Sequence, residues 1–269
     1  MVLDRVPPII NLFCDKLATF KFSNSLVFKP VIIEISNKEA EQKLFDEVFD
    51  YFKYVDEKFS TYKKTSEIMK INRNEIKKEE WSLDMQEIFK LADEAKKISH
   101  GYFDIMTPDG MYDPSGIVKG WAIQNASNIL KNHGIKNFYV EAGGDIQAYG
   151  KNEENTPWFI GIQNPFNEKR EVIKSVYLSD NGIATSGTYV RGQHIYNPHK
   201  KGEKIKDIVS LSVIGPNILE ADKIATSAFA MGKDGIYFVE ELSGFEGYMI
   251  EKNGIATMTT GFNNYTKIQ

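Results

Sequence analysis

The residues with the clearest chemistry lie in one glycine-rich turn that runs into a predicted helix, Asp113-Pro114-Ser115-Gly116-Ile117-Val118-Lys119-Gly120-Trp121-Ala122. The start of a helix exposes unpaired N–H groups and the positive end of the helix dipole, so it favours phosphate groups. Lys119 adds a mobile positive charge near that start, and Asp113 adds a carboxylate beside it. By itself, this segment predicts an anion-binding or nucleotide-binding site.

Asp222 and Thr226 form a second pair with chemical potential. They are four residues apart in a predicted helix, so their side chains point to the same face. A carboxylate and a hydroxyl on one face suit a hard cation such as Mg²⁺, which prefers oxygen ligands and leaves room for phosphate oxygens. Such pairs are also common on exposed helix faces, and on this pair alone the surface interpretation is favoured.

Other polar segments allow two interpretations each. Gly143-Gly144-Asp145 follows an apolar strand and either cradles a phosphate or turns the chain, and it lacks the third glycine of a dinucleotide fingerprint. His194 follows the polar run Thr185-Ser186-Gly187-Thr188 and is a candidate base or ligand-orienting donor, although a lone loop histidine is more commonly structural or solvated. Tyr62 and Tyr102-Phe103-Asp104 offer aromatic rings that either stack on a flat ligand or pack in the core.

Composition and missing motifs disfavour several classes of protein. The chain has no Gly-x-Ser-x-Gly elbow, His-Glu-x-x-His motif or P-loop, which argues against the common hydrolases and kinases. The formal net charge is −4 and no basic block is present, so nucleic acid is not an expected partner. Cys14 is the only cysteine, so no internal disulfide is expected. The other three histidines have no comparable polar company and are expected to be structural or exposed: His100, His133 and His199.

No segment is apolar over enough residues to span a bilayer, so membrane insertion is not expected. The first residues, Met1 to Pro8, lack the basic region and apolar run of a signal peptide. The sequence therefore predicts a cytoplasmic protein, although a secreted homologue with its signal removed would look similar.

The predicted elements mix helices and strands without regular βαβ alternation, which predicts an α+β fold. One helix is expected over 39–58 with a buried apolar stripe, and another over 84–99. A third runs from the Asp113 segment to Gly134, with His133 on its apolar face. The last helix is expected from Asn217 to Gly232, capped by Asn217 with Glu220 placed for a capping box. Strands are expected within 18–35 (two strands), at 137–142, 146–149, 158–163, 172–178 and 209–214, and as a pair over 247–258, with a polar stretch between 178 and 209.

The order of the motif blocks is more specific than any one of them. The blocks are Thr61-Tyr62, Ser66-Glu67-Ile68, Ile71-Asn72, Gly101-Tyr102-Phe103-Asp104, the segment from Asp113 to Ala122, Ala142-Gly143-Gly144-Asp145-Ile146, Ala184-Thr185-Ser186-Gly187, His194-Ile195 with Pro198, and Ala221-Asp222 with Thr226. In this order, from about residue 17 to residue 232, they resemble the ApbE family, the Mg²⁺-dependent FAD:protein FMN transferases.

The resemblance implies one domain over residues 1–269 with a two-lobed α+β fold, in which mixed or antiparallel sheets are flanked by helices and FAD lies between the lobes. It implies transfer of the FMN half of FAD to a threonine or serine of an acceptor flavoprotein, with release of AMP and with Mg²⁺, or alternatively Mn²⁺, as the metal. Since the same groups would serve an attacking water, hydrolysis of FAD to FMN and AMP is an alternative. A flavin-binding protein without catalysis is another.

The resemblance also implies residue roles. The expected FAD contacts are Leu17, Tyr62, Tyr102, Phe103, Asp104, Asp113, Lys119 and Ile195. The expected metal ligands are the backbone carbonyl of Gly116 and the side chains of Asp222 and Thr226. His194 is expected near the reacting phosphate, and the catalytic set is His194, Asp222 and Lys119. Asp113 is an alternative to His194 as the base.

The chain departs from the family pattern at two places. It reads Leu17-Ala18-Thr19 where the family usually carries Met-Gly-Thr, and it has Ala225 where many members have an acidic or hydroxylic residue. The second departure predicts one metal ligand fewer and weaker metal binding. The usual signal peptide or lipobox cysteine is also absent, which makes the chain similar to the soluble branch of the family.

Overall fold

The computed structural model describes residues 20–22, 31–36, 41–167, 171–187, 195–200 and 203–268. Its strands are β1 (Phe20–Phe22), β2 (Val31–Ile35), β3 (Phe138–Ala142), β4 (Asp145–Tyr149), β5 (Trp158–Gln163), β6 (Val172–Leu178), β7 (Gly182–Gly187), β8 (Tyr196–Asn197), β9 (Glu203–Lys204), β10 (Ile208–Gly215), β11 (Glu246–Glu251) and β12 (Ala256–Met258). Its α-helices are α1 (Gln42–Phe59), α2 (Glu67–Asn72), α3 (Leu83–Ile98), α4 (Ser115–Asn132), α5 (Ile218–Ala230) and α6 (Gly235–Glu241).

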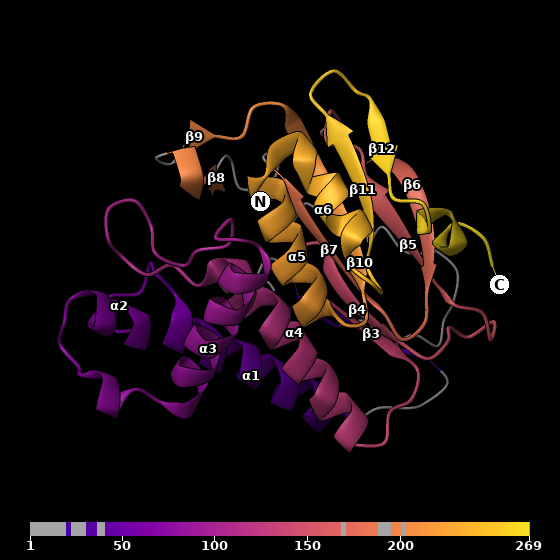
Figure 1. Ribbon diagram of the computed structural model, residues 1–269. Helices are drawn as coiled ribbons and strands as arrows, with labels where there is room; N and C mark the ends of the chain where they lie inside the picture. The colour runs from indigo at the N-terminus through magenta and orange to yellow at the C-terminus, as the bar shows by residue number, and fades with distance from the viewer. Residues whose placement is uncertain are drawn as a thin grey trace, which may run out of the picture.

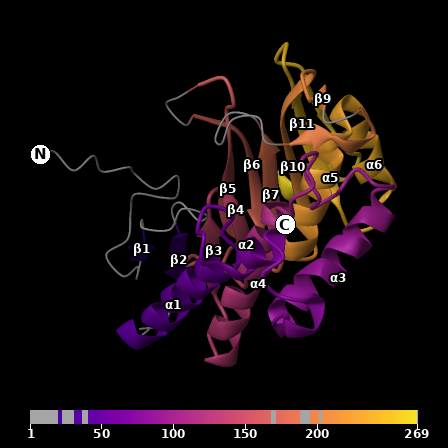
Figure 2. The ribbon, with the colours of Figure 1, turned by 90° about the vertical axis from the view of Figure 1, so that its left-hand side faces the viewer.

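One eight-stranded sheet joins both ends of the chain, in the order β1-β2-β3-β4-β7-β10-β11-β12. Each neighbouring pair in it is antiparallel. In Figure 2 the strands follow one another across the view from β1 to β11, with α1 near the β1–β3 end and α5 and α6 at the β10–β11 end. The predicted α+β fold, with antiparallel sheets flanked by helices, is confirmed.

The sheet is covered on both faces, which explains why β2 is buried at all five of its positions. Helices α1 to α6 cover one face and enclose the larger core with alternate sheet residues such as Val213 and Met249. The β5–β6 hairpin covers the other face and encloses a second core, which contains Trp158, Tyr139 and Ile214. Figure 1 shows α4 and α5 side by side over the first face, where the candidate site lies.

The strongest periodic patterns predicted their elements well. The apolar stripe of the helix expected over 39–58 is buried in α1, which confirms its core role: Leu44, Phe45, Val48, Phe49, Phe52 and Val55. The helix ahead of Gly134 is α4, and Gly134 has φ +75°, the left-handed conformation that ends such helices. The Asn217 side chain accepts a hydrogen bond from Glu220 N–H at 3.0 Å, so the predicted cap of α5 is confirmed.

Two predictions about the elements were wrong, and one strand was not predicted. The helix after Asn217 is not the last, because the chain turns at Gly232 and continues as α6. His133 is not on the apolar face of α4: its side chain is about half exposed and lies 3.0 Å from the Glu47 carboxylate. The polar stretch between 178 and 209 contains β7, a central strand. Small residues are required in β7 because α5 packs closely on it, and a Cβ at Gly182 would overlap the backbone nitrogen of Ile218.

No helix in the described part of the chain is both long and apolar enough to cross a membrane. The cytoplasmic location and the extent of the single domain stay predictions.

A buried carboxyl on the hairpin side of the sheet gives a pH-dependent prediction. Burial raises the pKa of Glu34 above its ordinary 4.5, and Glu153 adds to this, while the hydrogen bond from Tyr139 (2.7 Å) opposes it. The unfolded chain therefore loses this proton at a lower pH than the folded chain does, which costs stability as the pH rises above about 4.5. We expect Glu34→Gln to gain stability relative to the wild type between pH 4 and pH 7, as measured by urea unfolding. A stability difference that does not change with pH would contradict this.

Candidate active site

Two glycines of α4 set how closely α5 approaches. A Cβ at Gly120 would lie 2.7 Å from Asp222 Cβ and 2.9 Å from the Ile218 carbonyl oxygen. A Cβ at Gly116 would lie 3.1 Å from Thr226 Cγ2. Because Gly116 faces Thr226 and Gly120 faces Asp222, the two helices run antiparallel along a glycine-lined contact. This contact brings Asp222 and Thr226 of α5 onto the turn that begins α4.

Asp222 is nearly enclosed at this contact, with a relative exposure of 2 %. Its Oδ2 accepts a hydrogen bond from the backbone N–H of Gly120 at 2.8 Å. In a regular helix that N–H points to the carbonyl one turn earlier, which is that of Gly116. Thr226 Oγ1 donates to the same Gly116 carbonyl at 3.3 Å. The interpretation of Asp222 and Thr226 as an exposed surface pair is therefore wrong.

Lys119 lies between two buried carboxylates. Its Nζ is 2.6 Å from Asp145 Oδ2 and 3.9 Å from Asp222 Oδ1. Asp145, only 1 % exposed, also accepts a hydrogen bond at Oδ1 from Thr185 N–H at 3.0 Å. The ammonium group is thus held at the α4–α5 contact with carboxylates on both sides, in surroundings that strengthen its electrostatic interactions.

Asp145 is a site residue that the sequence analysis did not select. Gly143 and Gly144 have φ +62° and +93° and form the turn between β3 and β4, so the turn interpretation of that block is confirmed. The same turn starts β4 with the Asp145 carboxylate facing α4. The acid directly after a glycine pair was the available signal, but its partner Lys119 is 26 residues away and could be assigned only from the fold.

The oxygen atoms at the contact suit a hard cation. A backbone carbonyl (Gly116), a carboxylate (Asp222) and a hydroxyl (Thr226) are the types of ligand that Mg²⁺ prefers, and the set leaves coordination positions for phosphate or water. In the described residues no group of three or more His, Cys, Asp and Glu side chains could hold a metal, so a metal here needs the carbonyl and the hydroxyl. Ala225 is fully buried in the helical core, and its methyl side chain has no atom that could bind a metal.

Asp113 holds the entry to α4. Its Oδ1 accepts a hydrogen bond from Ser115 N–H at 3.0 Å, and its own N–H donates to the Ile105 carbonyl at 2.7 Å. Pro114, the residue at the N-cap, makes no side-chain cap bond. Asp113 therefore orients the first turn of the helix that carries Gly116 and Lys119.

The side chains of the Tyr102-Phe103-Asp104 turn make different kinds of contact. Phe103 is 2 % exposed, and its ring lies 3.5 Å from where a Cβ of Gly116 would be, so it supports the start of α4 from inside the core. Asp104 Oδ2 lies 2.6 Å from Lys96 Nζ, and its Oδ1 accepts a hydrogen bond from Met106 N–H at 2.9 Å. The structure thus brings Phe103 to the α4–α5 contact, in a packing role.

The segment from Ile195 to Lys200 packs along the same loop. Tyr196 donates its hydroxyl hydrogen to the Met106 carbonyl at 3.1 Å. Burial raises the pKa of Tyr196, and the negative charges of Asp104, Asp113 and Asp109 raise it further. Ile195 is half-buried against the helical core.

His199 lies in this segment and has partners that the sequence did not predict. Its ring meets the Tyr102 ring edge-on at 4.5 Å between centroids, and its Nε2 is 3.0 Å from the His100 carbonyl oxygen. His199 thus connects the segment after His194 to the turn that carries Tyr102. His199 is exposed, as expected, but its contacts with Tyr102 and His100 were not predicted from the sequence.

The remaining predicted site residues are Tyr62, Leu17 and His194. Tyr62 is 77 % exposed, so its side chain is open to a ligand. Leu17 and His194 lie outside the described residues, and their expected contacts stay predictions.

Fold and site together define an α+β protein with an antiparallel sheet and a buried acidic and lysine-containing site between two glycine-packed helices. The chain belongs to the ApbE family, whose model matches residues 29–109 and 106–249.

Curated relatives and solved structures agree with this assignment. The FAD:protein FMN transferase of Vibrio cholerae is 34% identical over 167 residues, which cover 59% of this chain and 48% of that protein. That of Escherichia coli (strain K12) is 31% identical over 155 residues, covering 55% and 44%, so the chain spans about half the length of these two relatives. The FAD:protein FMN transferase of Haemophilus influenzae is 26% identical over 286 aligned positions, 82% of each chain.

The solved structures share the fold. Flavin transferase ApbE from Vibrio cholerae superposes with a TM-score of 0.78 at 22% identity, covering 93% of this chain and 99% of that one. The ApbE protein from Thermotoga maritima superposes with a TM-score of 0.80 at 21% identity, with the same coverage.

Proposed function

We propose that this chain transfers the FMN half of FAD to a threonine or serine hydroxyl of an acceptor flavoprotein. The acceptor oxygen forms a bond to the FMN phosphorus, the bond from that phosphorus to the bridging oxygen breaks, and AMP leaves with the bridging oxygen. The observation that carries the proposal is the meeting of Lys119, Asp222, Thr226 and the Gly116 carbonyl at the α4–α5 contact, in a chain of this family.

The residues of the site are suited to a diphosphate. The Lys119 ammonium, held by Asp145 at 2.6 Å, offers a fixed positive charge to the phosphate oxygens. The Tyr62 ring is exposed and can stack on a flat ring system. Mg²⁺, or alternatively Mn²⁺, held by the Gly116 carbonyl, Asp222 and Thr226 would neutralise charge on the diphosphate. In the proposal the hydroxyl proton passes to His194, with Asp113 as the alternative base.

The direct test is incubation of the protein with FAD, Mg²⁺ and acceptor flavoprotein domains. We expect a flavin-fluorescent acceptor band, a mass increase equal to one FMN less water, and AMP in equal amount, all abolished by EDTA and by replacing the acceptor threonine with valine. AMP release at the same rate without acceptor would instead identify an FAD pyrophosphatase. FAD binding with neither product would identify a non-catalytic flavin-binding protein.

The contact between His199 and Tyr102 gives a second expected result. Tyr102 is an expected FAD contact, and the His199 ring packs against it. Since an aromatic pair is worth about 0.5–1.5 kcal/mol, we expect His199→Ala to raise the KM for FAD by about two- to tenfold with a smaller change in kcat. His199→Phe keeps a ring against Tyr102 and should fall between this variant and the wild type. The control is His133→Ala, which removes an exposed histidine from the far end of α4. Equal KM values for the two alanine variants would contradict the role of His199.

A further inference from the structure

Asn72 forms a two-point bracket on the main chain next to Asp113. Its side-chain Nδ2 donates to the Tyr112 carbonyl at 2.9 Å, and its Oδ1 accepts from the Tyr112 N–H at 2.7 Å. The two residues are 40 positions apart in sequence. A side-chain amide carries a donor and an acceptor side by side, so it can pair with both main-chain groups of one residue as a neighbouring strand would.

The peptide that Asn72 holds leads directly into the candidate site. Tyr112 pairs with Met106 in a β-bridge, and the next N–H, that of Asp113, donates to the Ile105 carbonyl. Asp113 in turn orients the first turn of α4 through Ser115 N–H. The main chain of Tyr112 is thus held on one side by the bridge to Met106 and on the other by the Asn72 side chain.

Helix α2 ties this bracket to the Tyr62 turn. Asn72 is the last residue of α2, and Ser66 caps its start. Ser66 Oγ donates to the Ser60 carbonyl at 2.7 Å, and Ser60 Oγ accepts from Tyr62 N–H at 3.3 Å. One short helix therefore has the Tyr62 turn at its start and the Tyr112 bracket at its end.

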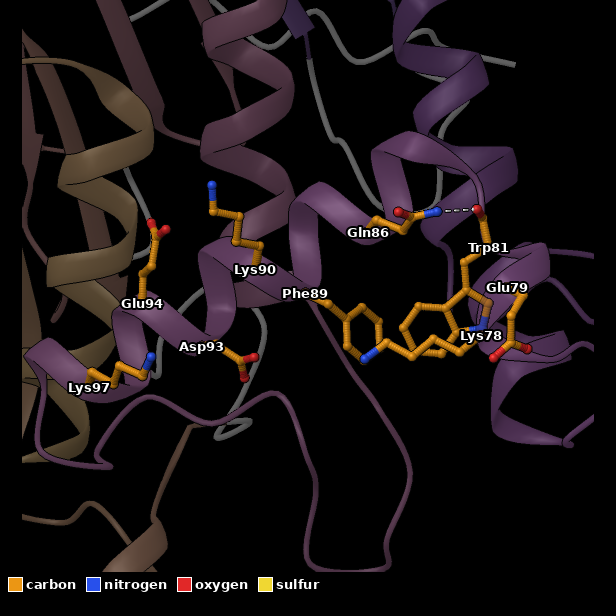
Figure 3. A pocket seen from close by; sticks show the side chains of 9 residues that line it. All are labelled: Lys78, Glu79, Trp81, Gln86, Phe89, Lys90, Asp93, Glu94 and Lys97. Carbon is orange, nitrogen blue, oxygen red and sulfur yellow. Dashed lines mark hydrogen bonds between the residues drawn. The ribbon is translucent and has the colours of Figure 1, made fainter.

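The Tyr112 ring is supported from α3. Phe89 meets it edge-on at 4.8 Å between ring centroids, and Phe89 lies 4.5 Å from Trp81. Phe89 and Trp81 line a pocket of about 490 Å³. Figure 3 shows their rings side by side, and the Gln86 side chain donates a hydrogen bond to the Trp81 carbonyl at 2.8 Å. The residues that line this pocket lie within 78–81 and in α3, so the pocket is separate from the α4–α5 contact.

We propose that Asn72 is a positioning residue for FAD binding, which acts by fixing the backbone of Tyr112 and therefore the placement of Asp113. The proposal rests on the proposed function only in that Asp113 binds FAD. Aspartate at position 72 would have nearly the same shape as asparagine, but its carboxylate has no hydrogen to donate to the Tyr112 carbonyl oxygen. One of the two hydrogen bonds would therefore be lost.

The test measures FAD affinity without any acceptor, by quenching of flavin fluorescence, together with kcat and KM for transfer. Two hydrogen bonds are lost in Asn72→Ala, and we expect its Kd for FAD to rise about tenfold, with Asn72→Asp at least as weak. The kcat at saturating FAD should change less than the Kd. Asn152→Ala is the matched control, because Asn152 Oδ1 accepts three hydrogen bonds in the β4–β5 connection. It should lower the Tm and leave the Kd for FAD unchanged.

A double-mutant cycle separates positioning from general destabilisation. If Asn72 acts through Asp113, Asn72→Ala should add little to the loss of FAD affinity caused by Asp113→Ala. Additive losses, or an unchanged Kd in both Asn72 variants, would overturn the proposal. A wild-type protein that does not bind FAD would instead refute the proposed function, so the two failures are distinguishable.

Discussion

Replacement of Asp222 by alanine is expected to lower the rate of FMN transfer by about 10²–10³-fold, the range measured when one preorganised charge-stabilising contact is removed from an active site. The reason is that the Asp222 carboxylate is a proposed metal ligand. It also accepts a hydrogen bond from Gly120 N–H at 2.8 Å and lies 3.9 Å from Lys119 Nζ. The measurement is the initial rate of flavin attachment over a Mg²⁺ titration at saturating FAD.

Asp222→Asn separates the charge from the packing. The asparagine oxygen can still accept from Gly120 N–H, so this variant should stay folded, while the Mg²⁺ concentration at half-maximal rate should rise. Asp234→Ala removes an exposed carboxylate just beyond α5 and should match the wild type in both respects. An Asp222→Asn enzyme with unchanged Mg²⁺ dependence would show that this carboxylate is not a metal ligand.

Gly120→Ala is expected to damage both stability and activity. Alanine favours a helix by about 1 kcal/mol over glycine, but here its Cβ would lie 2.7 Å from Asp222 Cβ and 2.9 Å from a backbone oxygen of α5. Overpacking of this kind costs about 1–3 kcal/mol, so we expect a net loss of unfolding free energy. We also expect reduced transfer, because Asp222 must move away from Lys119.

Two substitutions in the same helix calibrate this result. A Cβ at Gly116 would meet Thr226 Cγ2 at 3.1 Å, and that methyl group can shift, so Gly116→Ala should destabilise less. Asn128→Ala changes only the exposed side of α4, where Asn128 bonds to Gln124, and should stay near the wild type. Urea unfolding of the three variants should give the order Gly120→Ala, Gly116→Ala, Asn128→Ala, from least to most stable. A Gly120→Ala protein as stable as the wild type would contradict the close approach of the two helices.

Sequence reasoning located those parts of the fold that depend on local signals. The apolar residues of α1 recur at helical spacing, which predicts a buried face without knowledge of the partner. The cap at Asn217 and the turn at Gly143 and Gly144 are decided by residues three positions apart or fewer. Sequence also identified the family, because the order of several weak motifs is itself specific.

The parts that sequence missed depend on partners distant along the chain. Four of the six residues of β7, Gly182, Ala184, Ser186 and Gly187, are small and have low strand propensity, and the segment becomes a strand because β4 and β10 pair with its two edges. Its small residues make physical sense only once α5 is seen against Gly182. The same holds for His199, whose partner Tyr102 is 97 positions earlier and carries no local signal of the contact.

Residue types and local spacing are enough to show which groups are available for chemistry: a lysine and an acid at a helix start, and an acid and a hydroxyl one turn apart. That Lys119 lies within 4 Å of both Asp145 and Asp222, and that Gly116 faces Thr226, follows from the way the helices and strands pack. The physical reason is that local propensity acts over a few residues, whereas a site is formed by helices and strands that meet through close packing. Gly116 and Gly120 allow α4 and α5 to pack closely, and this close packing brings Lys119 near Asp222.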